Sequence, residues 1–281
     1  MQELSRNLQM TEFQTDKSRQ IISLAISAAI KAGDAIMEIY NGSDFDIKIK
    51  DDNTPLTKAD KASHNIILKT FNDGGNKWPE LSEEGKNIPY ETRKNWKHFW
   101  LIDPLDGTKE FIKKNGEFTV NIALIEKNTP VMGVIYVPAR KTLYAGIVGK
   151  GAWKIGNISS TINFQKMIVQ GMNLPFIKKR NKYTIVGSRS HMNQETIDFI
   201  ENIKKRHPQY EIVSVGSSLK ICLVAEGSAD IYPRFGPTME WDTAAGHAIA
   251  KAAGKKMITF KEKSELVYNK KNLINPNFIV L

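Results

Sequence analysis

Apolar residues recur at helical spacing near the start of the chain and predict its first long helix. These positions are Ile22, Ile26, Ala29, Ile30, Gly33, Ile36 and Tyr40. Thr15-Asp16 provides a capping residue before the pattern and Gly42 a stop after it, so we expect the helix to lie between them. A second helix is predicted over residues 59–72, ahead of Gly74-Gly75.

Runs of β-branched and aromatic residues predict strands through the middle of the chain. They cover residues 98–102, 117–126, 131–137 and 142–148, with a turn at 128–130. Gly149 and Gly151 then break the strand pattern.

Strands and helices alternate in the last third of the chain, which indicates α/β layers. We expect strands at 183–187, 211–215 and 229–233, and helices at 192–206, 217–226 and 242–253. The stretch 155–181 mixes Gly, Asn, Ser and basic residues and is the predicted subdomain boundary. The chain is therefore divided into a loose extension at 1–16, an α+β subdomain at 17–156 and an α/β subdomain at 157–281.

Composition and the apolar runs add four exclusions. The 281 residues are 41% hydrophobic and 25% charged, which is ordinary globular usage and argues against a disordered chain. The longest apolar run, residues 21–30, is too short for a membrane span, and the N-terminus lacks the apolar region of a secretory signal. A single cysteine, Cys222, cannot form an intrachain disulfide, fits a reducing compartment and is expected to be a packing residue.

The chain carries 40 basic and 30 acidic residues, a formal net charge of +10. The densest basic runs are Lys178-Lys179-Arg180, Lys204-Lys205-Arg206 and Lys255-Lys256. Each run is short and lies beside helical or turn sequence, so the simplest interpretation is a solvated face. Zinc-finger spacing and RNA-binding signatures are missing from the sequence, so charge alone does not indicate a nucleic-acid binder.

The strongest chemical feature is the sequence DPLDGT at 103–108, directly after a predicted strand. Asp103 and Asp106 can converge on one point, and Pro104 stiffens the turn between them. Gly107 permits close backbone approach, so the amides of Gly107 and Thr108 can face an anion. Clustered carboxylates repel one another and favour a bound cation, and oxygen ligands favour Mg²⁺. A tight acidic turn without a ligand is the alternative.

Further acids lie at other loop and helix ends. Asp60 begins the second predicted helix, Glu83-Glu84 lies in a loop, and Asp242 lies at a helix N-terminus. Taken singly, Glu83 and Asp242 are ordinary solvated or capping residues. His247, one turn beyond Asp242, is expected to be a packing residue, and the histidines show no spacing typical of a zinc site.

Taken in order, Asp60, Glu83-Glu84, DPLDGT at 103–108 and WDTAA at 241–245 resemble the signature of the lithium-sensitive, magnesium-dependent phosphomonoesterases. That superfamily includes inositol monophosphatase and fructose-1,6-bisphosphatase, and the resemblance runs from about residue 17 to the C-terminus. It implies an α/β/α/β/α layered sandwich with the metal site between two subdomains.

Within the superfamily, the chain is most similar to the CysQ group of 3′(2′),5′-bisphosphate nucleotidases. The segments that carry this similarity are 103–126, GSRSH at 187–191, 217–238 and WDTAAGHAI at 241–249.

The resemblance also implies roles for individual residues, with two or three Mg²⁺ ions per site. The implied metal ligands are Glu83, Asp103, Leu105 through its backbone carbonyl, Asp106 and Asp242. Asp60 and Thr108 match the pair that orients a water, and Glu83 is the other candidate for removing its proton. The scissile phosphate is expected to contact the residues around these ions, namely Glu83, Leu105, Asp106, Gly107, Thr108 and Asp242.

Substrate choice depends on basic residues that are each ordinary surface cations when taken alone. The candidates are Arg189, His191, Lys220 and Arg234. Inositol monophosphatases carry a glutamate near the position of Arg234, which receives sugar hydroxyls, whereas arginine suits a second phosphate. A 3′,5′-bisphosphate nucleotide, with close to four negative charges, also fits the basic balance.

The expected function is hydrolysis of the 3′-phosphate of 3′-phosphoadenosine 5′-phosphate to AMP, with its sulfated relative as a further substrate, in sulfate assimilation. An inositol monophosphatase is the nearest alternative, and a non-catalytic nucleic-acid or anionic-membrane binder is the alternative of another class. The expected location is the cytoplasm, without an integral membrane segment. Peripheral contact with the inner face of the inner membrane and the oligomeric state stay open.

Overall fold

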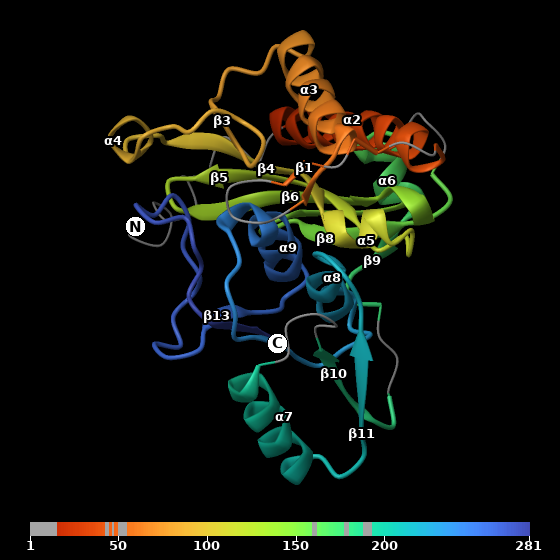
Figure 1. The fold of residues 1–281 in the computed structure, drawn as a ribbon, viewed down its shortest axis with the longest axis vertical. Coiled ribbons are helices and arrows are strands. Elements are labelled where there is room, and N and C mark those ends of the chain that lie inside the picture. The colour runs from red at the N-terminus through yellow and green to blue at the C-terminus, as the bar shows by residue number, and fades with distance from the viewer. Residues whose placement is uncertain are drawn as a thin grey trace, which may run out of the picture.

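The predicted N-terminal helices form the first layer of the protein. The structure, a computed structural model, describes residues 16–42, 45–46, 48–49, 55–158, 162–176, 180–187 and 193–281. Helix α2 (Asp16–Tyr40) and helix α3 (Lys58–Asp73) have nearly the predicted bounds. They lie side by side over one face of a sheet and bury the apolar stripe of α2 there (Figure 1).

By length and hydropathy alone, one described helix is apolar enough to cross a membrane, although the sequence analysis predicted no span from the apolar run. The most apolar 18-residue window of residues 17–40 has a mean hydropathy of 1.4, because α2 continues well beyond the run at 21–30. Half of its most apolar window is buried within the protein. Ile22, Ile26 and Ile36 are inaccessible in the core, so the apolar face of α2 is covered by α3 and the sheet.

A large central sheet forms the second layer. Within the described residues its seven strands have the order β3-β4-β5-β6-β7-β8-β9, and β3 is parallel to β4 whereas the other neighbours are antiparallel. The strands are β3 (Glu80–Ser82), β4 (His98–Asp106), β5 (Thr119–Glu126), β6 (Thr129–Val137), β7 (Thr142–Ile147), β8 (Gly151–Ile155) and β9 (Met172–Asn173).

Three sequence expectations for this sheet are corrected. Strand β4 continues through Asp106 instead of ending at 102, and the turn before β6 precedes Thr129. The glycines near 150 break the strand pattern as predicted, because they separate β7 from β8. The stretch 155–181, predicted as a boundary of mixed composition, contains helix α6 (Phe164–Gln170) and strand β9, because Phe164 and Met167 are buried in the same core as α2. The division at residue 156 itself stays a prediction.

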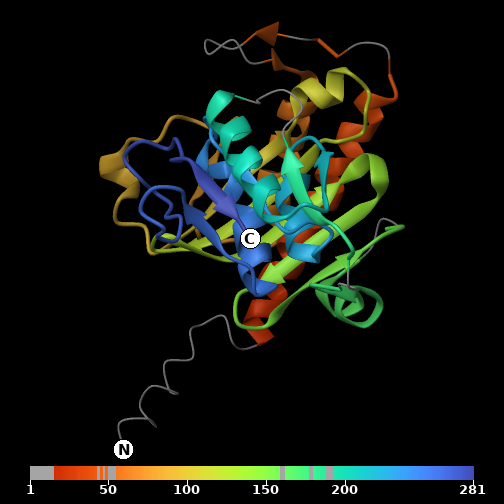
Figure 2. The ribbon, with the colours of Figure 1, turned by 90° about the horizontal axis from the view of Figure 1, so that it is seen from below.

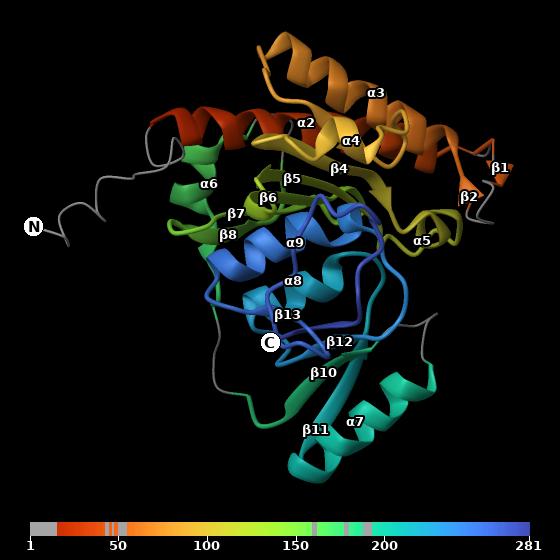
Figure 3. The ribbon, with the colours of Figure 1, turned by 90° about the vertical axis from the view of Figure 1, so that its left-hand side faces the viewer.

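Helices α8 (Leu219–Glu226) and α9 (Glu240–Ala252) cover the other face of the central sheet (Figure 3). Gly133 on β6 makes this packing close, because a Cβ there would lie 2.2 Å from the Ala245 carbonyl oxygen. Cys222 and His247 are buried in this layer, as expected of packing residues. His247 Nδ1 lies 3.1 Å from the Tyr268 hydroxyl, and its Nε2 lies 3.2 Å from Glu265.

A smaller group of strands forms the fourth layer, and α7 (Gln194–Arg206) forms the fifth and lies toward the viewer in Figure 2. β10 (Tyr183–Gly187) is parallel to β11 (Tyr210–Ser214), and β14 (Phe278–Val280) lies between β12 (Tyr232–Arg234) and β13 (Met257–Thr259). A bridge between Ile185 and Ile231 joins the two groups. The strand predicted at 229–233 therefore begins later, at Tyr232. The α/β/α/β/α layering is confirmed (Figure 3).

Short elements complete the described chain. They are β1 (Lys48–Ile49), β2 (Pro55–Leu56), α4 (Tyr90–Arg93), α5 (Thr108–Ile112) and the 3₁₀ turn η2 (Pro138–Arg140).

Candidate active site

The end of β4 brings two carboxylates to one place. The pairing of β4 with β5 shifts between Asp103 and Asp106, so the strand is irregular there. The Leu105 amide donates to Asp103 Oδ1 at 3.1 Å, and Gly107 has φ +93° at the start of α5. That left-handed backbone favours glycine, and it turns the chain from the strand into the helix.

Glu83 reaches the same end of the sheet through β3. Because β3 runs parallel to β4 and pairs Ser82 with Ile102, the residues that follow, Glu83 and Asp103, lie at the same edge of the sheet. The Glu83 amide donates to the Ile102 carbonyl at 3.1 Å. Glu83 therefore lies beside Asp103. The order of the residues in the sequence does not by itself require this proximity.

Asp242 arrives from the opposite layer, in the first turn of α9. Its Oδ2 accepts the Met239 amide at 2.8 Å, as a carboxylate in the first helical turn commonly does. The close approach of α9 to the central sheet therefore directs Asp242 toward the end of β4.

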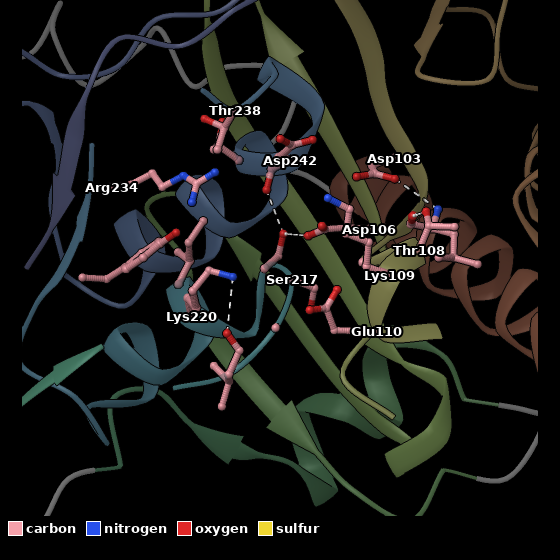
Figure 4. Close-up of a pocket in the computed structure, with 18 of the residues that line it drawn as sticks. Asp103, Asp106, Thr108, Lys109, Glu110, Ser217, Lys220, Arg234, Thr238 and Asp242 are labelled. Atoms are coloured by element: carbon pink, nitrogen blue, oxygen red, sulfur yellow. Dashed lines mark hydrogen bonds between the residues drawn. The ribbon is translucent and has the colours of Figure 1, made fainter. Parts of the chain in front are cut away.

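These carboxylates line one pocket of about 270 Å³ (Figure 4). The predicted residues that line it are Glu83, Asp103, Leu105, Asp106, Gly107, Thr108, Lys220, Arg234 and Asp242. Arg189 and His191 lie outside the described residues. Asp60 does not itself line the pocket, but it accepts a hydrogen bond from Thr108, which does.

Hydrogen bonds from Thr57 fix the Asp60 side chain that contacts Thr108. Thr57 donates to Asp60 Oδ2 through its amide at 2.8 Å and its hydroxyl at 2.6 Å. Asp60 Oδ1 accepts the Thr108 hydroxyl at 3.2 Å. With its proton directed to Asp60, the Thr108 hydroxyl keeps its lone pairs for a donor in the pocket.

The structure adds two polar residues that the sequence analysis did not single out. The Ser218 hydroxyl lies 2.7 Å from both Asp106 Oδ2 and the Asp242 carbonyl, and it accepts from Asn121 Nδ2 at 2.8 Å. Asn121 Nδ2 also lies 3.3 Å from Asp106 Oδ2. A polar residue inside the apolar run of β5 was the available signal for Asn121. This network connects the central sheet, α8 and α9 at the site.

A basic wall faces the carboxylates. In Figure 4, Arg234 and Lys220 lie on the opposite side of the pocket from Asp103, with Asp106 and Asp242 between. Arg234 is 7% exposed and donates through Nη2 to the Pro237 carbonyl at 2.8 Å. Burial lowers the pKa of Lys220, while the nearby Asp106 carboxylate opposes this change.

Two buried polar atoms of this wall lack a hydrogen-bond partner within the described part of the chain. They are Arg234 Nε and the Ser217 hydroxyl, and both residues line the pocket. A buried polar group without a partner is costly, so both atoms fit a ligand that brings oxygen atoms.

The electrostatics of the acid side favour a cation. Burial, followed by the charges of Glu83, Asp106 and Asp242, holds the pKa of Asp103 well above its usual range. Burial and then the charge of Asp106 likewise raise the pKa of Asp242. No three acidic, His or Cys side chains among the described residues already enclose a metal position. The donors nevertheless are all oxygen, as Mg²⁺ requires, and a cation between them would offset their repulsion.

We expect Mg²⁺ to stabilise the metal-free protein, and more strongly at pH 8 than at pH 5.5. A raised folded-state pKa means that the folded form binds more protons than the unfolded form. Without metal, its stability therefore falls as pH rises above the usual carboxyl value of about 4. Mg²⁺ binds the deprotonated form. At a hundredfold excess over Kd, it should add about 2.7 kcal/mol, or roughly 5–10 °C in Tm.

Thermal unfolding in EDTA and then in excess Mg²⁺ at the two pH values measures this effect. Na⁺ at matched ionic strength is the control. A Tm increase that is the same at both pH values, or that Na⁺ reproduces, would contradict a cation site formed by raised-pKa carboxylates.

Comparison with known proteins agrees with this geometry. The sequence profile of the inositol monophosphatase family matches residues 17–279. A Salmonella typhimurium protein named 3′(2′),5′-bisphosphate nucleotidase CysQ is 44% identical over 253 residues, covering 90% of this chain and 96% of that protein. A protein of the same name from Buchnera aphidicola is 45% identical, covering 86% and 85% of the two chains.

A solved structure agrees as well. The crystal structure of CysQ from Bacteroides thetaiotaomicron, described as a bacterial member of the inositol monophosphatase family, is 50% identical with a TM-score of 0.86. The match covers 93% of this chain and 97% of that chain. A profile that spans almost the whole chain, relatives above 40% identity and a shared fold lead to one conclusion: this chain belongs to the inositol monophosphatase family.

Proposed function

We propose that this chain is a Mg²⁺-dependent 3′(2′),5′-bisphosphate nucleotidase that hydrolyses the 3′-phosphate of 3′-phosphoadenosine 5′-phosphate to AMP and phosphate. The observation that carries the proposal is the two-sided pocket, with acids on one wall and Arg234 and Lys220 on the other. The acids suit metal-assisted phosphate chemistry, and the basic wall suits a second phosphate on the same substrate. The names of the relatives support the same activity.

The acid wall holds the metal. Glu83, Asp103 and the Leu105 carbonyl are the proposed ligands of one ion, and Asp103, Asp106 and Asp242 those of another. When bound, Mg²⁺ supplies a more acidic water and stabilises the charge that develops on phosphate and leaving oxygens. Ser218 and Asn121 hold Asp106 in place through their hydrogen bonds.

Thr108 positions the attacking water. Its hydroxyl donates to Asp60, so its lone pairs are free to accept a hydrogen from a water in the pocket. Glu83, which also lines the pocket, is the other group suited to take the water's proton. The amides of Gly107 and Thr108 are suited to the equatorial phosphate oxygens, as donors aimed at developing charge.

The basic wall selects the substrate. Arg234 and Lys220 are proposed to bind the phosphate that is not cleaved, with Arg234 Nε and the Ser217 hydroxyl as donors that have no partner among the described residues. Arg189 and His191 stay predicted contacts of the same kind. The proposed place of the reaction is sulfate assimilation in the cytoplasm, where the sulfated relative of the bisphosphate is a further candidate substrate.

The test is phosphate release from 3′-phosphoadenosine 5′-phosphate, 3′-AMP and inositol 1-phosphate, each in Mg²⁺ and in EDTA. We expect the bisphosphate to be preferred by a wide margin and EDTA to abolish turnover. Preference for inositol 1-phosphate would favour an inositol monophosphatase instead. Binding of the bisphosphate without metal-dependent release would favour the non-catalytic alternative.

Lithium gives an independent check of the metal chemistry. Membership of the family leads us to expect inhibition by sub-millimolar to millimolar Li⁺ and none by the same concentrations of Na⁺ or K⁺. The measurement is the initial rate of phosphate release across a titration of each salt at fixed Mg²⁺. Equal responses to all three salts would indicate ionic screening and contradict the expectation.

A further inference from the structure

Three basic runs that are far apart in the sequence meet at a second pocket. This pocket has a volume of about 600 Å³. Its lining includes Arg180, Arg206 and Lys255, each from a different run, together with Lys182 and His207. Lys178 and Lys179 lie outside the described residues. The simplest interpretation of the runs from sequence was a solvated face, but the fold gathers members of all three around one hollow.

The second pocket is distinct from the candidate active site. β10 and β11 are parallel and pair over five positions, from Tyr183 with Tyr210 to Gly187 with Ser214. The second pocket lies at the start of both strands, and the turn after β11 lines the candidate active site. At about 3.3 Å per residue, the strands separate the two pockets by about 15 Å.

The charge of the second pocket is poorly balanced. Among the described lining residues Asp230 is the one acid, and it is already committed. Its Oδ1 pairs with Arg180 Nη2 at 2.6 Å, and its Oδ2 accepts the Thr184 amide at 2.7 Å. Within the described residues, Lys182, Lys255 and Arg206 have no carboxylate within ion-pair distance. Several cations with one neutralised acid attract an anion of multiple charge.

The pocket also offers a flat aromatic wall. The rings of Tyr183 and His207 stack with centroids 3.8 Å apart and an interplanar angle of 16°. Both residues line the pocket. Stacked rings beside cations suit a planar base joined to phosphates. A hollow of this size fits a small ligand better than it fits a flat membrane surface.

We propose that this second pocket binds a nucleotide that carries at least two phosphates, at a site separate from the candidate active site. The phosphates would contact Lys182, Arg206 and Lys255, and the base would lie against the Tyr183–His207 pair. This binding requires neither Mg²⁺ nor hydrolysis, so it does not depend on the proposed function.

Calorimetric titration with ADP in EDTA tests the proposal. To remove the main cation of the first pocket, the titrations are carried out in the Arg234→Ala background. The test variant adds Lys182→Gln, Arg206→Gln and Lys255→Gln, which remove three charges and keep similar stems. The control variant adds Lys69→Gln, Lys97→Gln and Lys127→Gln, which remove the same charge from exposed positions elsewhere.

We expect the test variant to bind ADP at least about tenfold more weakly than the parent protein, which carries Arg234→Ala alone, because charge-assisted contacts to phosphate are lost. The control variant should change affinity much less. Equal losses in both variants would reduce the effect to net charge and overturn the proposal, as would no loss in the test variant. Circular dichroism and Tm of each variant establish that the fold is retained.

Two further probes separate the ligand classes. Pyrophosphate should bind more weakly than ADP, because it cannot use the aromatic wall. Pyrophosphate binding as tight as that of ADP would overturn the assignment to a nucleotide. Sedimentation with phosphatidylglycerol vesicles should not differ between the test and control variants. Vesicle binding that is lost only in the test variant, without ADP binding by the parent, would overturn the proposal in favour of a membrane surface.

Discussion

Asp106→Asn is expected to lower Mg²⁺-dependent turnover by at least about two orders of magnitude, because metal stabilisation of the transition state supplies several kcal/mol. Asparagine keeps the shape of the side chain, and its carbonyl can still accept from Ser218, which lies 2.7 Å from Asp106 Oδ2. What it loses is the charge that a divalent cation requires. The change therefore tests the proposed ligand role of Asp106 more than its packing.

The fold of the Asp106→Asn protein should survive. Asp106 raises the pKa values of Asp103 and Asp242, so removing its charge relieves repulsion in the metal-free protein. Measuring kcat together with Tm in EDTA separates the two effects. Asp73→Asn, the same change at an exposed helix end, is the matched control. Near-normal turnover of the Asp106 variant would remove this residue from the metal site.

Arg234→Ala is expected to cost roughly 10- to 150-fold in kcat/KM on 3′-phosphoadenosine 5′-phosphate, because a charge-assisted hydrogen bond to phosphate is worth about 1.5–3 kcal/mol. The loss on 3′-AMP should be much smaller, since that substrate lacks the second phosphate. The contrast arises because Arg234 faces the carboxylates from the far wall of the pocket (Figure 4). Binding energy remote from the reacting phosphate can affect both KM and kcat.

The control for Arg234 must separate substrate binding from packing, since its side chain is 7% exposed. Arg234→Lys keeps the charge but lacks the planar fork, so it should recover part of the loss on the bisphosphate. Steady-state kinetics of wild type and both variants on both nucleotides give the comparison. An equal loss on the two substrates would make Arg234 structural.

The local periodicity of the sequence was sufficient to predict most of the helices and strands. The helices at the N-terminus and the strands of the central sheet depend on burying one face or one stripe, which neighbouring residues report directly. Short strands such as β3, β9 and β13 were missed, because pairing with distant partners stabilises them more than their own composition does. The strand predicted at 229–233 shifted to Tyr232 for the same reason: it pairs with β14, near the C-terminus.

The site residues also divide into those that the sequence indicated and those that only the fold revealed. The acidic motifs were visible in the sequence because they are contiguous or lie at element ends. Asn121 and Ser218 were not singled out, because their importance arises from their contact with each other and with Asp106, across 97 residues of chain. Arg234 Nε lacks a partner in the described part of the chain, and this is likewise a property of burial and direction, which residue identity does not specify.

The sequence by itself determined the layered class of fold and the family, and it singled out the carboxylates that line the pocket, because these follow from patterns within short segments and from their order. Tertiary structure alone decided which charges share a space. It placed Asp242 near the end of β4, Arg234 and Lys220 across the pocket from Asp103, and the three basic runs around a second hollow. Electrostatic interaction depends on distance and burial, and only the packing of the layers sets those quantities for residues far apart along the chain.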